Sequence, residues 1–416
     1  MVVQIRFLFR NVLRILAMCI RAVTAWFEAP YRQRLYKSSE NRTILFIIIM
    51  KNHFEIFKRI YNELKGDKRL RICFTDPLSI GKKWLSFLTQ AGIDSSQILA
   101  WHQVLLRRWD VCIDPDYYPP LVLRPTKWIQ TSHGAAGRAR DASCEDYTIS
   151  KKLRMYDKFF CYSQNQRHRA VVSGQLKNAD SAILVGYPKL DGLVDGSVSR
   201  DEVLGDYGAE PARLSVLYAP SWCNHLSLEQ IGDELIDILT DGPWTFMVKL
   251  HPRSYQAKSR SIGKDMGHKH NWKDFLDQRA EKGRLIHLSD QDTCRYLTAA
   301  DILITDHGST LFEYMVLGRP ILYYDSDQAG RFMSIGGRLE KIRKAAYSFQ
   351  TPNQALQLLK SLSSGRLTDS QEKLTAKKQL VDEVFYDVGG ATKRAITAIY
   401  DVLKIAPPAG RSGTFL

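Results

Sequence analysis

The feature that most constrains the fold of this chain is a regular alternation of short apolar runs with longer runs of helical periodicity. Thr43–Met50 (TILFIIIM) is apolar almost throughout and rich in β-branched residues, which is typical of a strand buried on both faces of a parallel sheet. A helix is predicted over His53–Lys65, and a second strand over Leu70–Thr75. Strands and helices that alternate in this way predict a parallel sheet covered by helices on both faces.

The alternation pauses once and then begins again. Val194–Arg200 (VDGSVSR) is small and polar, and it is therefore predicted to be a linker. Beyond it, strands are predicted at Leu214–Ala219, Trp244–Leu250, Ile302–Thr305 and Pro320–Tyr324. A chain of 416 residues has room for about two to three domains, so the restart favours two similar α/β domains.

The predicted organisation has five parts. Residues 38–195 form an acceptor-side domain and residues 196–385 a donor-binding domain. Both are doubly wound and Rossmann-like, and they face a cleft beyond the carboxyl ends of their strands. A closing helix is predicted over residues 386–405 and a disordered tail over residues 406–416. The remaining part, residues 1–37, has a different character.

Residues 1–37 carry seven Lys and Arg side chains and one acidic side chain, so they supply +6 of the net charge of +15. On a helix, Arg6, Arg10, Arg14 and Arg21 would lie within an arc of about 80°. The stretch between Arg14 and Arg21 is far shorter than the ~20 apolar residues that a membrane-spanning helix needs. We predict a basic amphipathic helix that lies on an anionic membrane surface. The alternative is a core or dimer helix with a solvated arginine edge.

The seven cysteines are odd in number, far apart and without a C-x-x-C pair, which argues against a zinc ribbon or a dithiol redox site. We therefore expect a reducing compartment, and a peripheral position at the cytoplasmic face of the cell membrane. Asp114-Pro115-Asp116 has the D-x-D form of some metal sites, but the Tyr-Tyr-Pro-Pro that follows indicates a turn. No metal and no bound cofactor are predicted.

The first motif at a predicted strand end is Trp128–Asp141 (WIQTSHGAAGRARD). His133 follows the strand in a loop of small residues, where it is a candidate general base. Gly134 allows close approach of a ligand to the backbone, and Arg138 is suited to phosphate. The alternative is a structural histidine in a tight turn.

The second motif is Met247–Arg253 (MVKLHPR). His251 and Arg253 emerge where the strand ends, and Pro252 between them ends the strand. A histidine and an arginine at a strand end are suited to stabilising charge on a phosphoryl oxygen. Lys249 alone is better interpreted as a strand-edge residue.

The third motif, Asp301–Pro320, is the strongest. A buried strand leads into the loop Asp306-His307-Gly308, and Ser309 and Thr310, which are favoured N-cap residues, then open a helix. Gly308, Ser309 and Thr310 are therefore predicted to form an anion-binding turn for donor phosphates. Glu313 follows within one turn and is predicted to accept hydrogen bonds from ribose hydroxyls. The alternative is an ordinary capping box that only starts the helix.

The order of these motifs resembles the CDP-glycerol glycerophosphotransferase family, which builds teichoic-acid and capsule polymers on a GT-B fold. The resemblance covers residues 128–400 approximately and rests on six segments. These are His133-Gly134 (H-G-T-P in the family), Gly186–Asp191 (G-x-P-R-x-D), Tyr218–Trp222 (Y-A-P-T-W), Lys249–Pro252 (K-x-H-P), Thr305–Thr310 (T-D-Y-S-S) and the Gly- and Arg-containing segment Phe385–Arg394.

The resemblance implies a transferase that moves a polyol phosphate from a CDP-activated donor to a lipid-linked or polymeric acceptor. His133 would deprotonate the acceptor hydroxyl, which attacks the β-phosphorus, and CMP would leave. His251 and Arg253 would stabilise the developing charge. Ala135-Ala136-Gly137 and His307-Gly308 depart from the family pattern, so CDP-glycerol, CDP-ribitol and other nucleotide-activated units all stay open as donors.

Two other functions are compatible with the sequence. One is a glycosyltransferase or epimerase that uses a UDP-sugar on the same fold. The other is a non-enzymatic basic protein that binds polyanions or lipids, which the net charge of +15 suggests. The sequence contains no nucleic-acid-binding signature, and no nucleic-acid partner is predicted.

Overall fold

The computed structural model describes residues 41–76, 86–105, 107–117, 122–131, 151–223, 225–255, 269–288, 292–326 and 338–408, together with Leu16. The strands in these ranges form two sheets, and every strand pairs in parallel with its neighbours. The predicted α/β architecture with two parallel sheets is therefore confirmed. The predicted membrane helix over residues 1–37 lies outside the described residues.

The first sheet has seven strands in the order β3-β2-β1-β4-β5-β6-β7. Their apolar side chains point alternately to the two faces, and both faces are buried. The strands are β1 (Arg42–Ile47), β2 (Leu70–Thr75), β3 (Ile98–Leu99), β4 (Val111–Asp114), β5 (Lys127–Gln130), β6 (Lys158–Cys161) and β7 (Ala182–Leu184).

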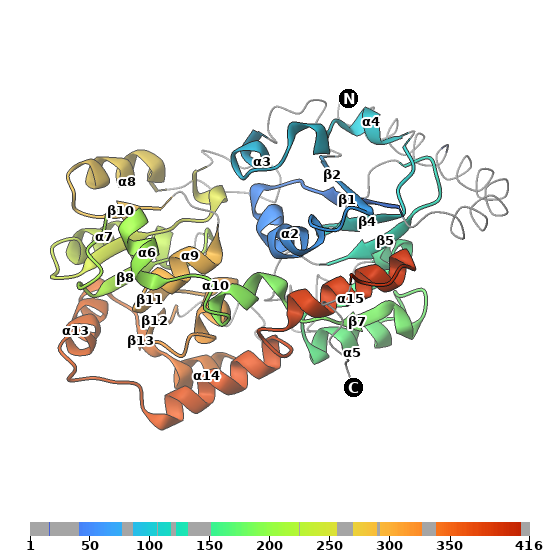
Figure 1. Ribbon diagram of the computed structural model, residues 1–416. Helices are drawn as coiled ribbons and strands as arrows, with labels where there is room; N and C mark the ends of the chain where they lie inside the picture. Colours follow the sequence, from blue (N-terminus) through green and yellow to red (C-terminus); the bar gives the residue numbers. More distant parts are fainter. Residues whose placement is uncertain are drawn as a thin grey trace, which may run out of the picture. The chain divides into compact units, whose positions relative to one another are not determined.

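Helices cover both faces of the first sheet (Figure 1). One face packs against α2 and the C-terminal helix α15, which Figure 1 draws in red among the blue and green elements of this part. The other face packs against α4 and α5. The helices are α2 (Lys51–Leu64), α3 (Ser86–Gln90), α4 (Trp101–Leu105), α5 (Gln164–Val172) and α15 (Ala391–Leu403).

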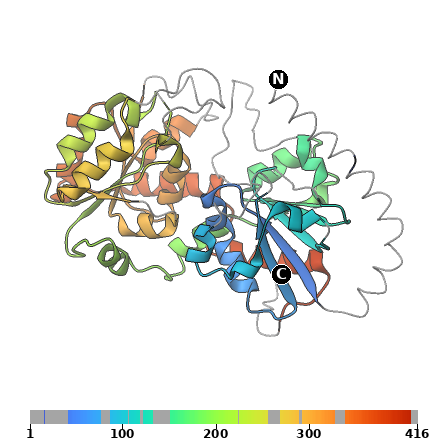
Figure 2. The ribbon, with the colours of Figure 1, turned by 90° about the horizontal axis from the view of Figure 1, so that it is seen from above.

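The second sheet has six strands in the order β10-β9-β8-β11-β12-β13. Figure 2 shows this sheet from above with its helices around it. The strands are β8 (Ser215–Tyr218), β9 (Thr245–Val248), β10 (Ile286–His287), β11 (Ile302–Thr305), β12 (Ile321–Tyr324) and β13 (Tyr347–Phe349). The helices are α6 (Arg200–Asp206), α7 (Ser227–Leu239), α8 (Trp272–Glu281), α9 (Thr293–Ala299), α10 (Ser309–Met315), α12 (Arg338–Ala345), α13 (Pro352–Ser363) and α14 (Gln371–Val384).

The chain divides into two compact units. Among the described residues, the first contains the seven-stranded sheet and takes in those within 41–131, 151–189 and 390–408. The second contains the six-stranded sheet and takes in the described residues within 190–389. The chain thus passes between the units at 189/190 and again at 389/390, and α15 is part of the first unit although it follows the second in sequence.

Strand order reverses at the same place in each sheet. In the first unit the reversal lies between β1 and β4, and in the second between β8 and β11. In open parallel sheets, ligands bind beyond the carboxyl ends of the strands at such a reversal. The loops after β8 and β11 are therefore where a site is expected in the second unit.

Within the part of the chain that the structure describes, no helix combines the length and the apolar composition needed to cross a membrane.

Candidate functional site

Three loops leave the carboxyl edge of the second sheet side by side, because β8 lies between β9 and β11. The loop after β8 carries Ser221 and Trp222. The loop after β9 carries His251 and Arg253, and the loop after β11 carries residues 306–308. We call them the three site loops. The structure thus brings the second and third sequence motifs to one edge of one sheet.

Asp306 joins the first and third site loops. Its side chain is completely buried. One carboxylate oxygen accepts a hydrogen bond from the Ser221 backbone N–H at 2.8 Å. The other accepts from the backbone N–H and the hydroxyl of Ser227, the first residue of α7, at 3.1 and 2.6 Å. The Ser221 hydroxyl donates to the carbonyl oxygen of His307 at 2.5 Å, so the two loops are connected in both directions.

The environment of Asp306 changes its charge behaviour. Burial raises the pKa of Asp306 to about 6, although the hydrogen bonds from Ser227 and Ser221 favour the charged form and offset part of the rise. Above that pH the carboxylate is ionised and acts only as an acceptor. The ionised carboxylate then accepts hydrogen bonds from both Ser221 and Ser227. These bonds hold the first and third site loops in one arrangement.

Trp222 joins the first and second site loops. Its indole is 5% exposed. The guanidinium carbon of Arg253 lies 4.7 Å from a ring centroid of Trp222, and the His251 ring centroid lies 5.9 Å away with an interplanar angle of 32°. A guanidinium over the face of an indole is attracted by the electrons of the ring. His251 is exposed and Arg253 is half-buried, so a ligand can reach both.

The hydrogen bonding of His251 indicates which nitrogen carries the proton. Nδ1 accepts a hydrogen bond from the Arg253 backbone N–H at 3.1 Å. That bond uses the Nδ1 lone pair, so the neutral ring carries its proton on Nε2. A donor at Nε2 is suited to a phosphoryl oxygen, whereas a general base would need a lone pair there.

The third site loop enters α10 through glycine. Gly308 is the N-cap, its backbone is extended, and no side chain caps the helix. Ser309 and Thr310 are the first two helical residues, so the alternative interpretation of this motif as a capping box does not hold. A Cβ at position 308 would lie 2.8 Å from the Ser221 hydroxyl oxygen. Glycine is needed here for the close approach of the two loops.

Glu313 lies in the middle of α10 and is 1% exposed. Its predicted contact with ribose hydroxyls stays a prediction. Ser309 and Thr310 are half-buried, and their predicted contact with donor phosphates likewise stays a prediction. Lys249, which the sequence indicated as a strand-edge residue, is 8% exposed, and its ammonium group donates to the Leu250 carbonyl oxygen at 3.2 Å.

Residues of the first motif, His133, Gly134 and Arg138, lie outside the described residues, so their roles stay predictions. The neighbouring strand end is described. Asp114 accepts hydrogen bonds from the Asp116 backbone N–H at 2.9 Å and from the Tyr156 hydroxyl at 2.5 Å. The predicted turn at Asp114-Pro115-Asp116 is therefore confirmed. Across the described ranges, no group of three or more His, Cys, Asp or Glu side chains is arranged to hold a metal ion.

Two residues that organise the site were not singled out from the sequence as functional. Trp222 and Asp306 both stood inside quoted motifs, Y-A-P-S-W and T-D-H-G. A tryptophan just after a predicted strand can indicate a ring against which neighbouring loop residues pack. The partner of Asp306, Ser227, is 79 residues away in sequence, and no local pattern marks it.

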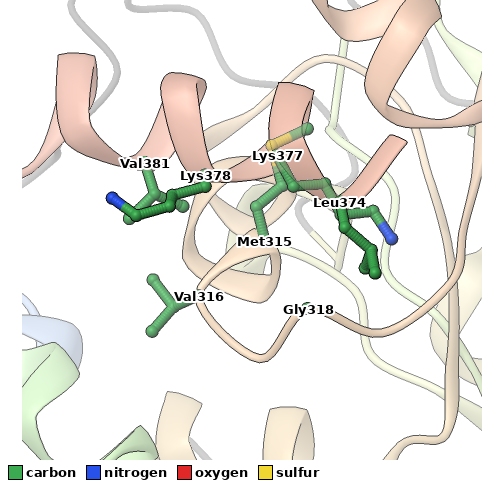
Figure 3. A pocket seen from close by; sticks show the side chains of 7 residues that line it. All are labelled: Met315, Val316, Gly318, Leu374, Lys377, Lys378 and Val381. Carbon is green, nitrogen blue, oxygen red and sulfur yellow. The ribbon is translucent and has the colours of Figure 1, made fainter. Parts of the chain in front are cut away.

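A separate hollow lies between the other end of α10 and α14 (Figure 3). Lys377, one of the lysines around it, is 1% exposed and donates to the Arg319 carbonyl oxygen at 2.6 Å and to the Asp369 carboxylate. Because the hollow adjoins the C-terminal end of α10, it is not part of the three site loops. Its lining residues are Met315, Val316, Gly318, Leu374, Lys377, Lys378 and Val381.

Comparison with known sequences gives one family and two relatives. The family described as CDP-glycerol:poly(glycerophosphate) glycerophosphotransferase matches residues 31–399. Both relatives are from Bacillus spizizenii (strain ATCC 23059 / NRRL B-14472 / W23). A teichoic acid glycerol-phosphate primase is 26% identical over 156 residues, which are 36% of this chain and 35% of the primase. A teichoic acid poly(ribitol-phosphate) polymerase is 24% identical over 188 residues, which are 43% of this chain and 28% of the polymerase. The matches thus span about a third of each relative's length.

Comparison with solved structures gives the same fold. The wall teichoic acid polymerase TagF has a TM-score of 0.60 at 16% identity, over 97% of this chain and 98% of the TagF chain. The UDP-GlcNAc 2-epimerase from Neisseria meningitidis bound to UDP-GlcNAc has a TM-score of 0.51 at 10% identity, over 87% of this chain and 100% of the epimerase chain. At these identities the likeness concerns the fold alone.

Proposed function

The chain belongs to the CDP-glycerol:poly(glycerophosphate) glycerophosphotransferase family, and from this premise we propose that it transfers a polyol phosphate from a CDP-activated donor to a lipid-linked or polymeric acceptor. The observation that carries the proposal is the pair His251 and Arg253 packed against Trp222, on a site loop that neighbours the one in which Gly308 leads into α10. Arg253 supplies a cation and His251 an N–H donor at the carboxyl ends of the strands, where parallel sheets bind nucleotides.

The proposed reaction is a displacement at the β-phosphorus of the donor. The acceptor oxygen forms a bond to this phosphorus while the bond to the oxygen of the leaving CMP breaks. His133 takes the proton of the acceptor hydroxyl. Arg253 and the Nε2–H of His251 stabilise the negative charge that develops on the phosphoryl oxygens, and Gly308, Ser309 and Thr310 hold the diphosphate.

In this proposal the polyol of the CDP-activated donor is either glycerol or ribitol. One relative is named as a glycerol-phosphate primase and the other as a poly(ribitol-phosphate) polymerase. The three site loops contact phosphate and nucleotide in this proposal, so they accept either donor. The discrimination falls to residues around the transferred polyol.

We further propose that residues 1–37 attach the protein peripherally to the cytoplasmic face of the cell membrane. The support is their +6 charge and their predicted amphipathic pattern. Deleting residues 1–35 should release the protein from vesicles that contain anionic lipids and leave turnover of a water-soluble acceptor largely unchanged. Membrane binding that persists after the deletion would contradict this part of the proposal.

The test of function is donor turnover by the full chain. CDP-glycerol, CDP-ribitol and UDP-N-acetylglucosamine are supplied separately with a lipid-linked acceptor analogue, and release of CMP or UDP is measured. We expect CMP from at least one CDP-polyol and no UDP. A Ser309→Ala/Thr310→Ala variant should bind CMP more weakly in calorimetry. Release of UDP alone would favour the sugar transferase, whereas conversion of UDP-N-acetylglucosamine to its epimer without UDP release would favour the epimerase. Polyanion binding without turnover of any donor would favour the non-enzymatic alternative.

A further inference from the structure

The turn that follows His251 and contains Arg253 ends at a chain of three hydrogen-bonded side chains. Tyr255 is the last residue of this turn, the 3₁₀ turn Pro252–Tyr255. Its hydroxyl lies 2.8 Å from Nε2 of His287, and Nδ1 of His287 lies 2.6 Å from a carboxylate oxygen of Asp277. None of these residues belongs to the motifs that indicated the site.

The three residues come from three different elements. Asp277 is on α8, His287 is the last residue of the edge strand β10, and Tyr255 follows β9, the strand with which β10 pairs. The His287 side chain is 12% exposed. Because β10 is only two residues long, its own backbone pairing gives the turn little support, and the side-chain connection adds to it.

The direction of the two hydrogen bonds follows from the charges. Hydrogen bonds from Lys273 and His287 lower the pKa of Asp277, so its carboxylate is ionised at neutral pH and can only accept. Nδ1 of His287 therefore carries the proton that reaches Asp277. Burial raises the pKa of Tyr255 to about 12, so its hydroxyl keeps its proton and can donate to Nε2 of His287.

The turn is thus held from both sides. Trp222 packs against Arg253 and His251 on one side, and His287 holds Tyr255, four residues after His251, on the other. We infer that Tyr255, His287 and Asp277 are positioning residues that orient His251 and Arg253 toward the donor phosphates. They touch no reacting atom, and the inference rests on the proposed function.

A control pair in the same unit allows a sharp test. His270 forms an equivalent contact with a carboxylate, its Nε2 lying 3.0 Å from Asp233, and it packs against Phe275 and Trp272. This pair does not include any residue of the turn. His270→Leu therefore reports the general effect of removing a histidine–aspartate contact, and His287→Leu reports the same effect plus any loss of orientation.

The experiment measures CMP affinity by calorimetry, donor and acceptor KM, and the thermal midpoint, all in the full chain. Tyr255→Phe and His287→Leu should each weaken CMP binding and raise the donor KM about 3- to 10-fold, with the acceptor KM unchanged. The double variant should lose no more than the worse single variant, because both remove one connection. His287→Gln, which offers a donor and an acceptor, should recover part of the loss. His270→Leu should leave CMP affinity and donor KM at wild-type values.

Wild-type CMP affinity and donor KM in Tyr255→Phe would overturn the inference, as would equal losses in His270→Leu and His287→Leu. The proposed function fails separately, if the unmodified chain binds UDP and not CMP. The same variants would then be measured with UDP, so the positioning role is still tested.

Discussion

The two sheets begin alike and end differently. At the amino end of the central strands, Asp110 accepts hydrogen bonds from the backbone N–H and hydroxyl of Thr43 at 2.8 and 3.0 Å in the first unit. In the second unit, Asp301 accepts from the same two groups of Ser215, both at 2.9 Å. In both units the hydroxyl in turn accepts from the aspartate backbone N–H at 3.0 Å. We call these the amino-end pairs.

At the carboxyl end the aspartates have different partners. Asp114 of the first unit accepts from Tyr156, which precedes β6, whereas Asp306 of the second unit accepts from Ser221 and Ser227, which follow β8. Asp306 thereby connects the two loops at the point where strand order reverses in the second unit. We infer that the amino-end pairs support the fold that both units share. The hydrogen bonds of Asp306 with Ser221 and Ser227, by contrast, belong to the candidate site of the second unit.

The largest effect is expected at His133, the predicted base for the acceptor hydroxyl. His133→Ala should lower turnover by about 10²–10⁴-fold, the usual range for losing a positioned base, with CMP affinity nearly unchanged. His251→Ala should lower both turnover and donor affinity, since it belongs to the donor side. Steady-state kinetics measures turnover in the two variants, and calorimetry measures their CMP affinity. Near-normal turnover in a folded His133→Ala protein would show that His133 is not the base.

The second prediction concerns the two ends of β11. The pKa of Asp306 is about 6 against an ordinary 3.8, which corresponds to ~3 kcal/mol. The folded-state value lies above the unfolded one, so this stabilisation is present below about pH 4 and lost as the pH rises through about 6. Between these limits the free energy of unfolding of the wild type should fall by ~3 kcal/mol more than that of Asp306→Asn, measured by urea denaturation.

Asp301, at the other end of the same strand, gives the opposite sign. Burial alone would raise its pKa, but hydrogen bonds from Arg200 and Ser215 outweigh burial and lower it. Its contribution is therefore present above the unfolded pKa and lost as the pH falls. The pH curves of Asp301→Asn and Asp306→Asn should diverge from the wild type in opposite directions. Parallel curves for Asp306→Asn and the wild type would contradict the titration assigned to Asp306.

The third prediction addresses the close approach of the site loops. Gly308→Ala places a Cβ 2.8 Å from the Ser221 hydroxyl oxygen and should weaken CMP binding about tenfold, or ~1.4 kcal/mol. Adding Ser221→Gly removes the obstructing oxygen and should recover part of the affinity. A Cβ added at Gly205 on α6 would meet no atom within 4 Å, so Gly205→Ala is the matched control. An equal loss in the control would refute the steric explanation.

The smallest effects belong to the amino-end pairs. Thr43→Val and Ser215→Ala each remove one hydroxyl from a satisfied pair and should lower the free energy of unfolding by about 1 kcal/mol. CMP affinity and donor KM should not change in either variant. Calorimetric melting beside CMP titration measures both properties. A clear loss of CMP affinity in Ser215→Ala would break the distinction between the two ends of the sheet.

Much of the fold was predictable because buried parallel strands need continuous apolar runs, and such runs are visible in sequence. The predicted strands at Leu70–Thr75 and Ile302–Thr305 agree with β2 and β11 in their bounds. Helix α14 (Gln371–Val384) was not predicted. It is mostly polar, and only Ala376, Lys377, Leu380 and Val384 are buried, so its apolar signal is weak.

The sequence predicted which residues lie at the site. It predicted only in part the side-chain contacts that join the loops. His251, Arg253 and Gly308 stood at predicted strand ends, where parallel sheets bind ligands. The helix start was displaced by one residue, because Gly308 rather than a hydroxyl residue is the N-cap. The connections through Asp306, Trp222 and Tyr255 were not predicted, since each joins loops that are distant in sequence.

By itself, the sequence determined the two α/β units, the strand-end motifs and the charge of the N-terminal segment, because these depend on local composition and periodicity. The tertiary structure alone decided which loops lie together, why Asp306 has a pKa of about 6 and which nitrogen of His251 carries its proton. It also decided that His287 supports a turn 32 residues earlier. Burial and hydrogen-bond geometry set these properties, and both arise only when separate strands pair in one sheet.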